Sequence, residues 1–320
     1  MIYMKHTLLF LALAVFCVPF VKAGGAGTTA ASFLKIDPSA RSAALSGAVT
    51  AIADDDSALF NYNPASAAGI EQKQVSFTHT EWVINTRLEA LSYAQPLSET
   101  LTLGAAFNLL HTGSVGKTDE NGNYLGDSFR AMDGSLSLGL ANRFSKNVVL
   151  GGALKGVRQS MDSKNASALA GDIGAIVQFE RFSLGASLNN FGSDVKLNDD
   201  SSPLPRTVRG GFTVTPLPRL LLAFAADKAM DANTICRFGV EYSIRDIITG
   251  GDRYDLRAGY KSGSAENTGP GFSIGVGLKI KSLGLNYSFV PMGDLGSANR
   301  ISMSFSFGEK RKPPQLAAIQ

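Results

Sequence analysis

The sequence predicts an all-β protein: a transmembrane antiparallel β-barrel of about fourteen strands, with a small N-terminal helical hatch in its lumen. Three observations predict this fold. The chain begins with an export signal. Its 320 residues include 34 glycines and only 18% charged side chains, against about 7% glycine and about 25% charge in ordinary globular proteins. From Lys73 onward, runs that alternate apolar with small or polar residues recur along the chain.

Residues 1–23 have the pattern of a signal peptide. The basic Lys5 precedes the apolar run "TLLFLALAVFCVPF", which is too short to span a bilayer, and "VKA" then predicts cleavage after Ala23. A retained membrane anchor is the alternative. The part that follows has no apolar run of about 18 residues, so no transmembrane helix is expected there. We therefore expect export, with the bacterial outer membrane as the destination.

Residues 24–72 are alanine-rich and differ from the rest of the chain, and we predict that they form the hatch. Pro38 is placed to open a short helix and Gly47 to close it. The stretch "DDDSALFNY" predicts a second short helix capped by an Asp, ended by Asn63-Pro64. A segment of this size cannot bury enough surface to fold alone. We expect it to pack inside the barrel.

Residues 73–308 form the predicted barrel. The last run, "ISMSFSF", fits either a soluble β-sandwich or a membrane barrel, depending on which face lies inside. Successive side chains of a strand point to opposite faces. In a soluble sandwich the phenylalanines would form the core, whereas in an outer-membrane barrel they face lipid and the serines face the lumen. The second face of these runs is small and poor in charge. That favours the barrel, because a water-exposed face usually carries more Lys and Glu.

The connections between the runs provide a second signal, because after the second run they alternate in length. Short ones are "QPLSE", "SKN", "FER", "TPLP" and "KSLG", and long ones include "TGSVGKTDENGNYLGD", "GSDVKLNDDSSP", "KSGSAENTG" and "PMGDLGSA". Outer-membrane barrels have short periplasmic turns and longer extracellular loops, which places both chain ends in the periplasm. Two connections blur the pattern, since the one near Asn85 is short and "RDIITGGD" is long for a turn. A soluble barrel or propeller is the alternative. Residues 309–320 form the predicted periplasmic tail.

No catalytic, cofactor-binding or metal site is expected. Asp54, Asp55 and Asp56 lack the alternating oxygen ligands and the glycine of a calcium loop. His79 and His111 are the only histidines after the signal peptide, and neither lies near a cysteine or a suitably spaced carboxylate. The sequence has no Gly-x-Ser-x-Gly elbow and no phosphate-binding loop. Removal of the signal peptide lowers the formal charge from +3 to about +1, so nucleic acid is not an expected partner.

Three stretches give the sequence a resemblance to a known family: "FLKIDPSARSAALSGAVTAIADDDSALFNYNPASAAGI", "SFTHTEW" and "VPMGDLGSANRISMSFSF". They resemble the PorV/PorQ family of outer-membrane proteins, which is similar to the outer-membrane long-chain fatty-acid transporters with their Asn-Pro-Ala hatch motif. The match runs from about Phe33 to Phe307 and implies a barrel with a hatch inside. This chain has "LSGA" where Met-Gly-Gly-Ala is expected, and "YNPAS" where Trp-Asn-Pro-Ala-Gly is expected. Its hatch motif comprises Arg41, Gly47, Asp54, Asp56, Asn63, Pro64 and Ala65.

The resemblance implies an accessory barrel of type IX protein secretion, which binds or shuttles exported cargo at the cell surface. Its partners would be secretion-system components and the C-terminal domains of cargo. One alternative is a channel for hydrophobic small molecules, whose ligand would bind a lumen pocket. That pocket would be formed by Phe33, Leu34, Leu45, Phe60 and Tyr62. Another alternative is a structural barrel with a plugged lumen. In every case the barrel wall is expected to contact outer-membrane lipid, and none of these three functions is enzymatic.

Two expectations concern how the hatch is held. Arg41 is expected to form a buried ion pair with a barrel carboxylate such as Glu89 or Asp172, because a buried guanidinium needs a partner. The five predicted pocket residues have a second interpretation, in which they pack the hatch in place and bind no ligand.

Overall fold

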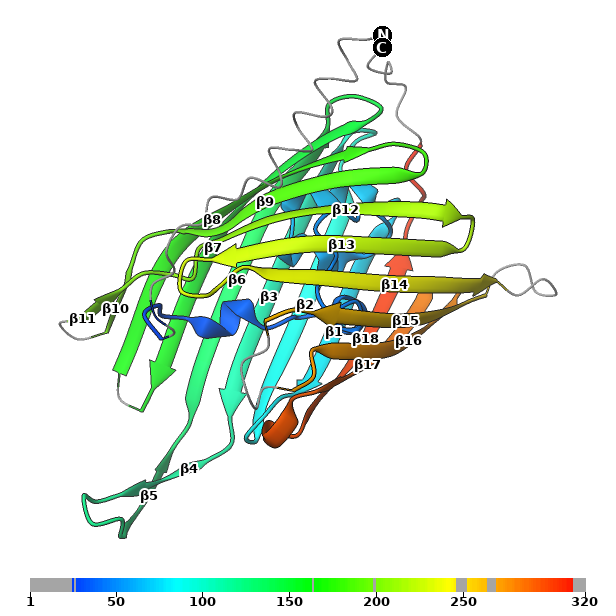
Figure 1. The fold of residues 1–320 in the computed structure, drawn as a ribbon. Coiled ribbons are helices and arrows are strands. Elements are labelled where there is room, and N and C mark those ends of the chain that lie inside the picture. Colours follow the sequence, from blue (N-terminus) through cyan, green and yellow to red (C-terminus); the bar gives the residue numbers. More distant parts are fainter. Residues whose placement is uncertain are drawn as a thin grey trace.

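Among the described residues, fourteen antiparallel strands form a closed barrel (Figure 1). The computed structural model describes residues 25, 27–162, 164–197, 200–245, 252–263 and 269–312, so the predicted signal peptide and residues 313–320 lie outside it. No helix in these ranges is long and apolar enough to cross a membrane. The barrel strands are β1 (Lys73–Glu81), β2 (Thr86–Pro96), β3 (Leu101–Thr112), β6 (Ala131–Arg143), β7 (Val148–Met161), β8 (Lys164–Gln178), β9 (Phe182–Gly192), β12 (Thr207–Leu217), β13 (Leu220–Ala229), β14 (Ile235–Arg245), β15 (Arg253–Lys261), β16 (Phe272–Ile280), β17 (Leu283–Pro291) and β18 (Ser297–Phe307).

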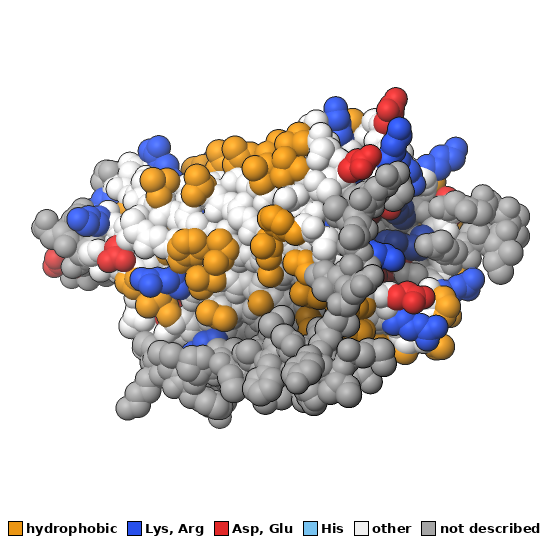
Figure 2. All heavy atoms as spheres, turned by 90° about the horizontal axis from the view of Figure 1, so that it is seen from above, with side chains coloured by type: hydrophobic (Ala, Val, Ile, Leu, Met, Phe, Trp, Pro, Cys, Tyr) orange, Lys and Arg blue, Asp and Glu red, His pale blue; other side chains and the backbone are white. Residues whose placement is uncertain are grey.

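The ring closes where β1 pairs with β18, from Lys73 opposite Phe307 to Glu81 opposite Asn299. Along β18 the side chain of Ile301 is 57% exposed, whereas its neighbour Ser302 is 4% exposed. The same alternation runs around the barrel, with large apolar side chains outward and small polar ones inward. Figure 2 shows apolar side chains over the visible wall and charged side chains mainly toward its ends. The predicted barrel and its sidedness are therefore confirmed.

The two ends of the barrel differ in their connections. One end, here called the turn end, carries the short connections 97–100, 144–147, 179–181, 218–219 and 281–282. The opposite loop end carries the hairpin of β4 (Val115–Thr118) and β5 (Tyr124–Phe129), which extends away from the barrel in Figure 1. It also carries the hairpin of β10 (Val195–Leu197) and β11 (Asp200–Ser202) and the short helix η4 (Gly293–Leu295).

Residues 27–72, here called the N-terminal segment, lie within the ring of strands in Figure 1 and contain four short helices. Each of the last three begins at a side-chain cap, because Ser39, Asp56 and Asn63 accept backbone N–H groups that a helix start leaves free. Asp56 is thus the Asp cap expected from "DDDS". The helices are η1 (Ser32–Lys35), α2 (Ala40–Ala44), η2 (Ser57–Asn61) and η3 (Pro64–Gly69).

The core of the molecule lies between this segment and the inner face of the wall. Phe60 and the alanines of η3 pack against Ala106, Val149 and Ile176 of the wall. Inward glycines let the backbones approach, since a Cβ at Gly151 would lie 2.4 Å from the amide nitrogen of Ala65. The glycine-rich inner face is explained by this close contact.

Candidate functional site

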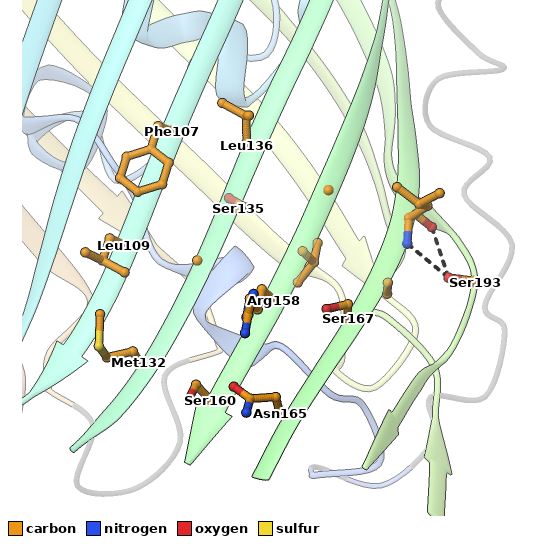
Figure 3. A pocket seen from close by; sticks show the side chains of 15 residues that line it. Phe107, Leu109, Met132, Ser135, Leu136, Arg158, Ser160, Asn165, Ser167 and Ser193 are labelled. Carbon is orange, nitrogen blue, oxygen red and sulfur yellow. Dashed lines mark hydrogen bonds between the residues drawn. The ribbon is translucent and has the colours of Figure 1, made fainter. Parts of the chain in front are cut away.

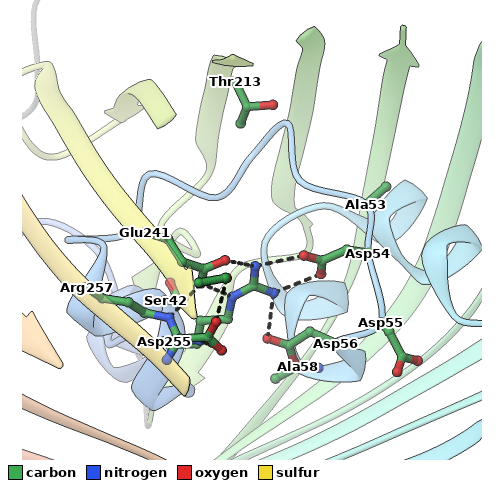
Figure 4. Close-up of polar contacts among 12 residues, drawn as sticks. Ser42, Ala53, Asp54, Asp55, Asp56, Ala58, Thr213, Glu241, Asp255 and Arg257 are labelled. Atoms are coloured by element: carbon green, nitrogen blue, oxygen red, sulfur yellow. Dashed lines mark hydrogen bonds and ion pairs between the residues drawn. The ribbon is translucent and has the colours of Figure 1, made fainter. Parts of the chain in front are cut away.

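Arg41 of α2, whose side chain is buried, is the centre of an ion cluster that joins the N-terminal segment to the wall. Figure 4 labels its carboxylate partners Asp54, Asp56 and Glu241. Arg41 Nε lies 2.8 Å from Glu241 Oε2 on β14, and its Nη1 and Nη2 donate to the two carboxylate oxygens of Asp54 at 2.8 and 2.7 Å. Asp56 Oδ2 lies 3.5 Å from Nη1. The pKa of Asp56 is raised, because burial favours its neutral form and Arg41 only partly opposes this. One guanidinium thus holds together two parts of the segment and one strand.

The expectation that Arg41 pairs with a barrel carboxylate is correct, but both residues suggested for it are wrong. Glu89 lies near His79, with 2.7 Å between its Oε1 and the ring Nδ1, on the outward face of β1 and β2. Asp172 forms an ion pair of 2.8 Å with Lys155. The actual partner is Glu241, far along the chain.

The ion cluster continues into the wall through Arg257 of β15. Its Nε donates to Glu241 Oε2 at 2.6 Å, its Nη2 to Asp255 at 2.8 Å and its Nη1 to Asn286 of β17 at 2.8 Å. Because Glu241 is shared by two guanidiniums, its negative charge is balanced although the carboxylate is buried. Inward charged residues at alternate strand positions are the sequence signal that could have found this network.

A second group of contacts holds the loop side of the segment. Tyr62 donates from its hydroxyl to Asp37 Oδ1 at 2.8 Å, and Arg300 Nε donates to the Asp37 carbonyl at 3.1 Å. Burial opposes the ionisation of Asp37, but Arg237, Arg300, the Tyr62 hydrogen bond and Arg209 together lower its pKa. Arg237 also donates to the carbonyl of Ser46 at 2.7 Å, where Gly47, at φ +81°, leaves room for its side chain.

The Asn-Pro-Ala motif contacts the inner wall at β8 and β9. Asn63 is fully buried, and its amide nitrogen donates to the carbonyls of Thr50 at 2.8 Å and Ala175 at 3.3 Å. Its side-chain oxygen accepts the backbone N–H of Ala65 at 3.1 Å, and Pro64 needs no partner for its nitrogen. The motif therefore serves both as a helix cap and as a bond to the wall.

The five predicted pocket residues do not line a single cavity. Phe33, Leu34 and Tyr62 line an enclosed cavity of about 30 Å³, together with polar Lys155 and Arg209. That volume holds about one or two waters, whereas benzene occupies a cavity of roughly 150 Å³.

The other two residues of the set are used for packing against the wall. Phe60 lies against Gly104, where a Cβ would come within 2.5 Å of its ring. Leu45 lies against Gly239 and Gly259. In this conformation Phe60 and Leu45 pack against the wall, as the second of the two interpretations expects of them.

The carboxylates of "DDD" are used for contacts of the same kind. Asp54 and Asp56 contact Arg41, and Asp55 contacts Lys279 at 2.5 Å. Within the described ranges, no three His, Cys, Asp or Glu side chains are grouped for a metal ion.

A depression of about 780 Å³ lies on the outer surface of the wall, toward the loop end of β3, β6, β7 and β8 (Figure 3). Phe107, Leu136 and Leu169 give it an apolar lining. The strand ladders behind it are continuous from β3 to β8. The depression is therefore separated from the lumen by an unbroken wall.

Comparison with solved structures shows the fold that this geometry belongs to. A FadL homologue from Pseudomonas aeruginosa matches with a TM-score of 0.58 at 10% identity, covering 84% of this chain and 98% of that one. The toluene transporter TbuX of Ralstonia pickettii matches with a TM-score of 0.58 at 12% identity, covering 83% and 97%. The toluene transporter TodX of Pseudomonas putida matches with a TM-score of 0.57 at 12% identity, covering 90% and 100%. At these identities the likeness shows a shared fold.

Comparison of sequences gives the family. No curated protein matches the chain. The model of the uncharacterised protein family UPF0164 matches residues 21–227, which is more than half of the sequence. The chain belongs to the family UPF0164.

Proposed function

We propose that this protein is an outer-membrane channel for hydrophobic small molecules, in which the N-terminal segment is the hatch that opens and closes the lumen. The observation that carries the proposal is a closed barrel whose lumen is occupied by a separate segment that belongs to none of its strands. The similar solved barrels named as toluene transporters support the class of ligand.

Opening requires the segment to move, because the cavity beside it is far smaller than a hydrophobic ligand. The segment has its own apolar cluster, in which Leu45, Val49 and Ile52 pack with Leu59 and Tyr62. This cluster joins its two halves, so the segment moves as one body.

On the α2 side, opening must break the ion pair between Arg41 and Glu241 and several hydrogen bonds to the wall. Ala40 N donates to Ser302 Oγ at 2.9 Å, and Ser273 Oγ donates to the carbonyl of Ala44 at 2.9 Å. Water can replace such bonds, each at a net cost of about 1 kcal/mol. The ion pair between Arg41 and Glu241 is therefore the main polar contact that opposes release of the α2 side.

A disulfide between α2 and the wall tests this proposal. The hydroxyl oxygens of Ser46, which follows α2, and Ser273 on β16 lie 2.8 Å apart, so cysteine sulfurs at these two positions would be close enough to bond. In a Cys236→Ser background, Ser46→Cys/Ser273→Cys is expected to take up toluene or oleate when reduced. Oxidation should lower uptake to the level of vesicles without the protein. Uptake is measured in outer-membrane vesicles prepared with and without the protein.

The matched control is Ser76→Cys/Ser304→Cys, at positions directly opposite each other on β1 and β18, which joins these strands within the wall and leaves the segment unlinked. Its uptake should not change on oxidation. Equal uptake by the oxidised and reduced Ser46→Cys/Ser273→Cys protein would contradict the proposal that the segment moves as a hatch. No uptake by the unmodified protein would contradict the proposal that the barrel is a channel.

The filled lumen favours a second candidate, the accessory barrel of protein export. A barrel that acts through its surface and its mouths needs no open passage, and the segment would then be a permanent plug. In this case the oxidised Ser46→Cys/Ser273→Cys protein would keep cargo secretion at the level of the unmodified protein, while deletion of the gene would abolish it.

A further inference from the structure

The turn end of the lumen opens into a depression of about 900 Å³ that is strongly basic. Eight of the side chains that line it are Lys or Arg, and three are Asp or Glu. Four of the cations have carboxylate partners: Arg41, Arg253, Lys279 and Lys310. Among the described residues, Arg143, Lys146, Arg311 and Lys312 have no ion pair, so the depression carries an excess of positive charge.

Two of these unpaired cations converge on one atom. Arg311 Nη2 donates to the carbonyl oxygen of Ala68 at 2.6 Å, and Arg143 Nη2 donates to the same oxygen at 3.5 Å. Arg143 is the last residue of β6 and Arg311 follows β18, so the fold brings them together from distant parts of the sequence. A neutral carbonyl cannot balance two guanidinium charges.

The chain holds Arg311 at this place by further bonds. Its backbone N–H donates to the carbonyl of Glu71 at 2.7 Å, and its Nη1 donates to Thr102 Oγ1 at 3.1 Å. Residues 309–312 of the predicted tail are therefore folded back onto the turn end. Burial lowers the pKa of Arg311, and the charge of Arg143 lowers it further. The like charges are thus close enough to repel each other.

We propose that Arg143 and Arg311, with Lys146 and Lys312 beside them, bind a multiply charged oxyanion of the phosphate class. Guanidinium forks match the oxygens of phosphate, and an anion bridging both would remove the repulsion. The site lies at the barrel mouth that the connection lengths assign to the periplasm. A phosphate there comes either from solution or from a lipid headgroup of the inner leaflet. This proposal goes beyond the channel, since it requires no movement of the segment.

Calorimetric titration of the full-length protein in non-ionic detergent tests the site. The probes are inorganic pyrophosphate and, separately, micelles doped with phosphatidylglycerol or phosphatidylcholine, all at constant ionic strength set with chloride. The unmodified protein is expected to bind at least one of the phosphate-bearing anionic probes. Arg143→Gln and Arg311→Gln should each weaken that binding by about tenfold or more, as the loss of a charge-assisted bond predicts. Binding of pyrophosphate but not of phosphatidylglycerol would identify the ligand as a soluble anion. Binding of phosphatidylglycerol but not of pyrophosphate would identify it as a lipid headgroup.

The control is Arg158→Gln, because Arg158 lies at the loop end of β7 and its side chain is exposed. It should bind as the unmodified protein does. Without phosphate, Arg143→Gln should unfold at the same temperature or higher, since it removes one of two like charges. The proposal is overturned if no phosphate-bearing probe binds, or if Arg143→Gln and Arg311→Gln bind as tightly as the control.

Discussion

Arg41→Ala is expected to cost about 3 kcal/mol of the free energy of unfolding, because it removes a guanidinium from the buried Glu241 and from the mostly buried Asp56. Glu241 keeps Arg257, but the half-exposed Asp54 and the mostly buried Asp56 lose the ion pairs that they form with Arg41. The segment should then leave the wall before the strands unfold. Urea titration followed by gel mobility of unheated samples measures the loss, and limited proteolysis of residues 27–72 detects release of the segment.

Two further variants show whether the loss is electrostatic. Arg41→Lys keeps the charge but loses the guanidinium fork that binds both Asp54 and Glu241. Its free energy of unfolding should therefore lie between those of the unmodified protein and Arg41→Ala. Arg41→Leu/Glu241→Leu removes both ends of one pair and should be more stable than Arg41→Ala. An Arg41→Ala protein with unchanged mobility and unchanged protection of the segment would contradict this account of the cluster.

Gly174→Val is expected to expel the Asn-Pro-Ala region from the inner wall. A Cβ at this position would lie 1.9 Å from Asn63 Oδ1 and 3.2 Å from Pro64 Cδ, in a fully packed region. Overpacking of this kind costs about 3 kcal/mol, and here it also breaks the Asn63 hydrogen bonds. Hydrogen exchange should show loss of protection in η3 with retention in the strands.

The matched control is Gly156→Val on the neighbouring strand β7, whose position faces outward. A Cβ there meets nothing within 4 Å. Both variants place the same β-branched side chain in a strand, so any difference reports the lumen contact. Equal stability and equal protection of η3 in the two proteins would show that the segment does not press against the wall at Gly174.

The barrel could be predicted from the sequence because its information is local. Alternate side chains of a strand face lipid and the lumen, so the pattern "ISMSFSF" predicts which side chains face outward without any information about the neighbouring strands. The pairing of Val75 with Phe305 requires closure of the ring, which no local pattern contains.

The partner of Arg41 could not be predicted in the same way, because it depends on where β14 lies around the ring. The alternation could have excluded Glu89, which shares its face of β2 with the outward side chains of Leu91 and Tyr93. By the same rule Glu241 shares the inward face with Gly239. Strand position therefore limits the possible partners of Arg41 to inward carboxylates. The positions of the strands around the closed barrel determine which of these carboxylates Arg41 contacts.

The roles of Phe60 and Leu45 could not be predicted from the sequence for a related reason. Phe60 and Leu45 are large apolar residues in a lumen segment, which suits either a ligand or packing. The wall decides between them, since Gly104 and Gly239 provide the space into which these side chains fit. The role of Phe60 thus depends on Gly104, 44 residues farther along the chain, and the role of Leu45 on Gly239, 194 residues farther along.

The direction in which the wall faces is the claim on which the rest depends, and accessibility of spin labels in liposomes measures it most directly. In a Cys236→Ser background, labels are attached to Leu154→Cys and Met303→Cys, positions whose side chains are 77% and 50% exposed on the outer wall. The account predicts that both labels relax with dissolved oxygen, which concentrates in acyl chains, and are protected from a water-soluble nickel chelate. Strong relaxation by the chelate at both positions would place these side chains in water and contradict it.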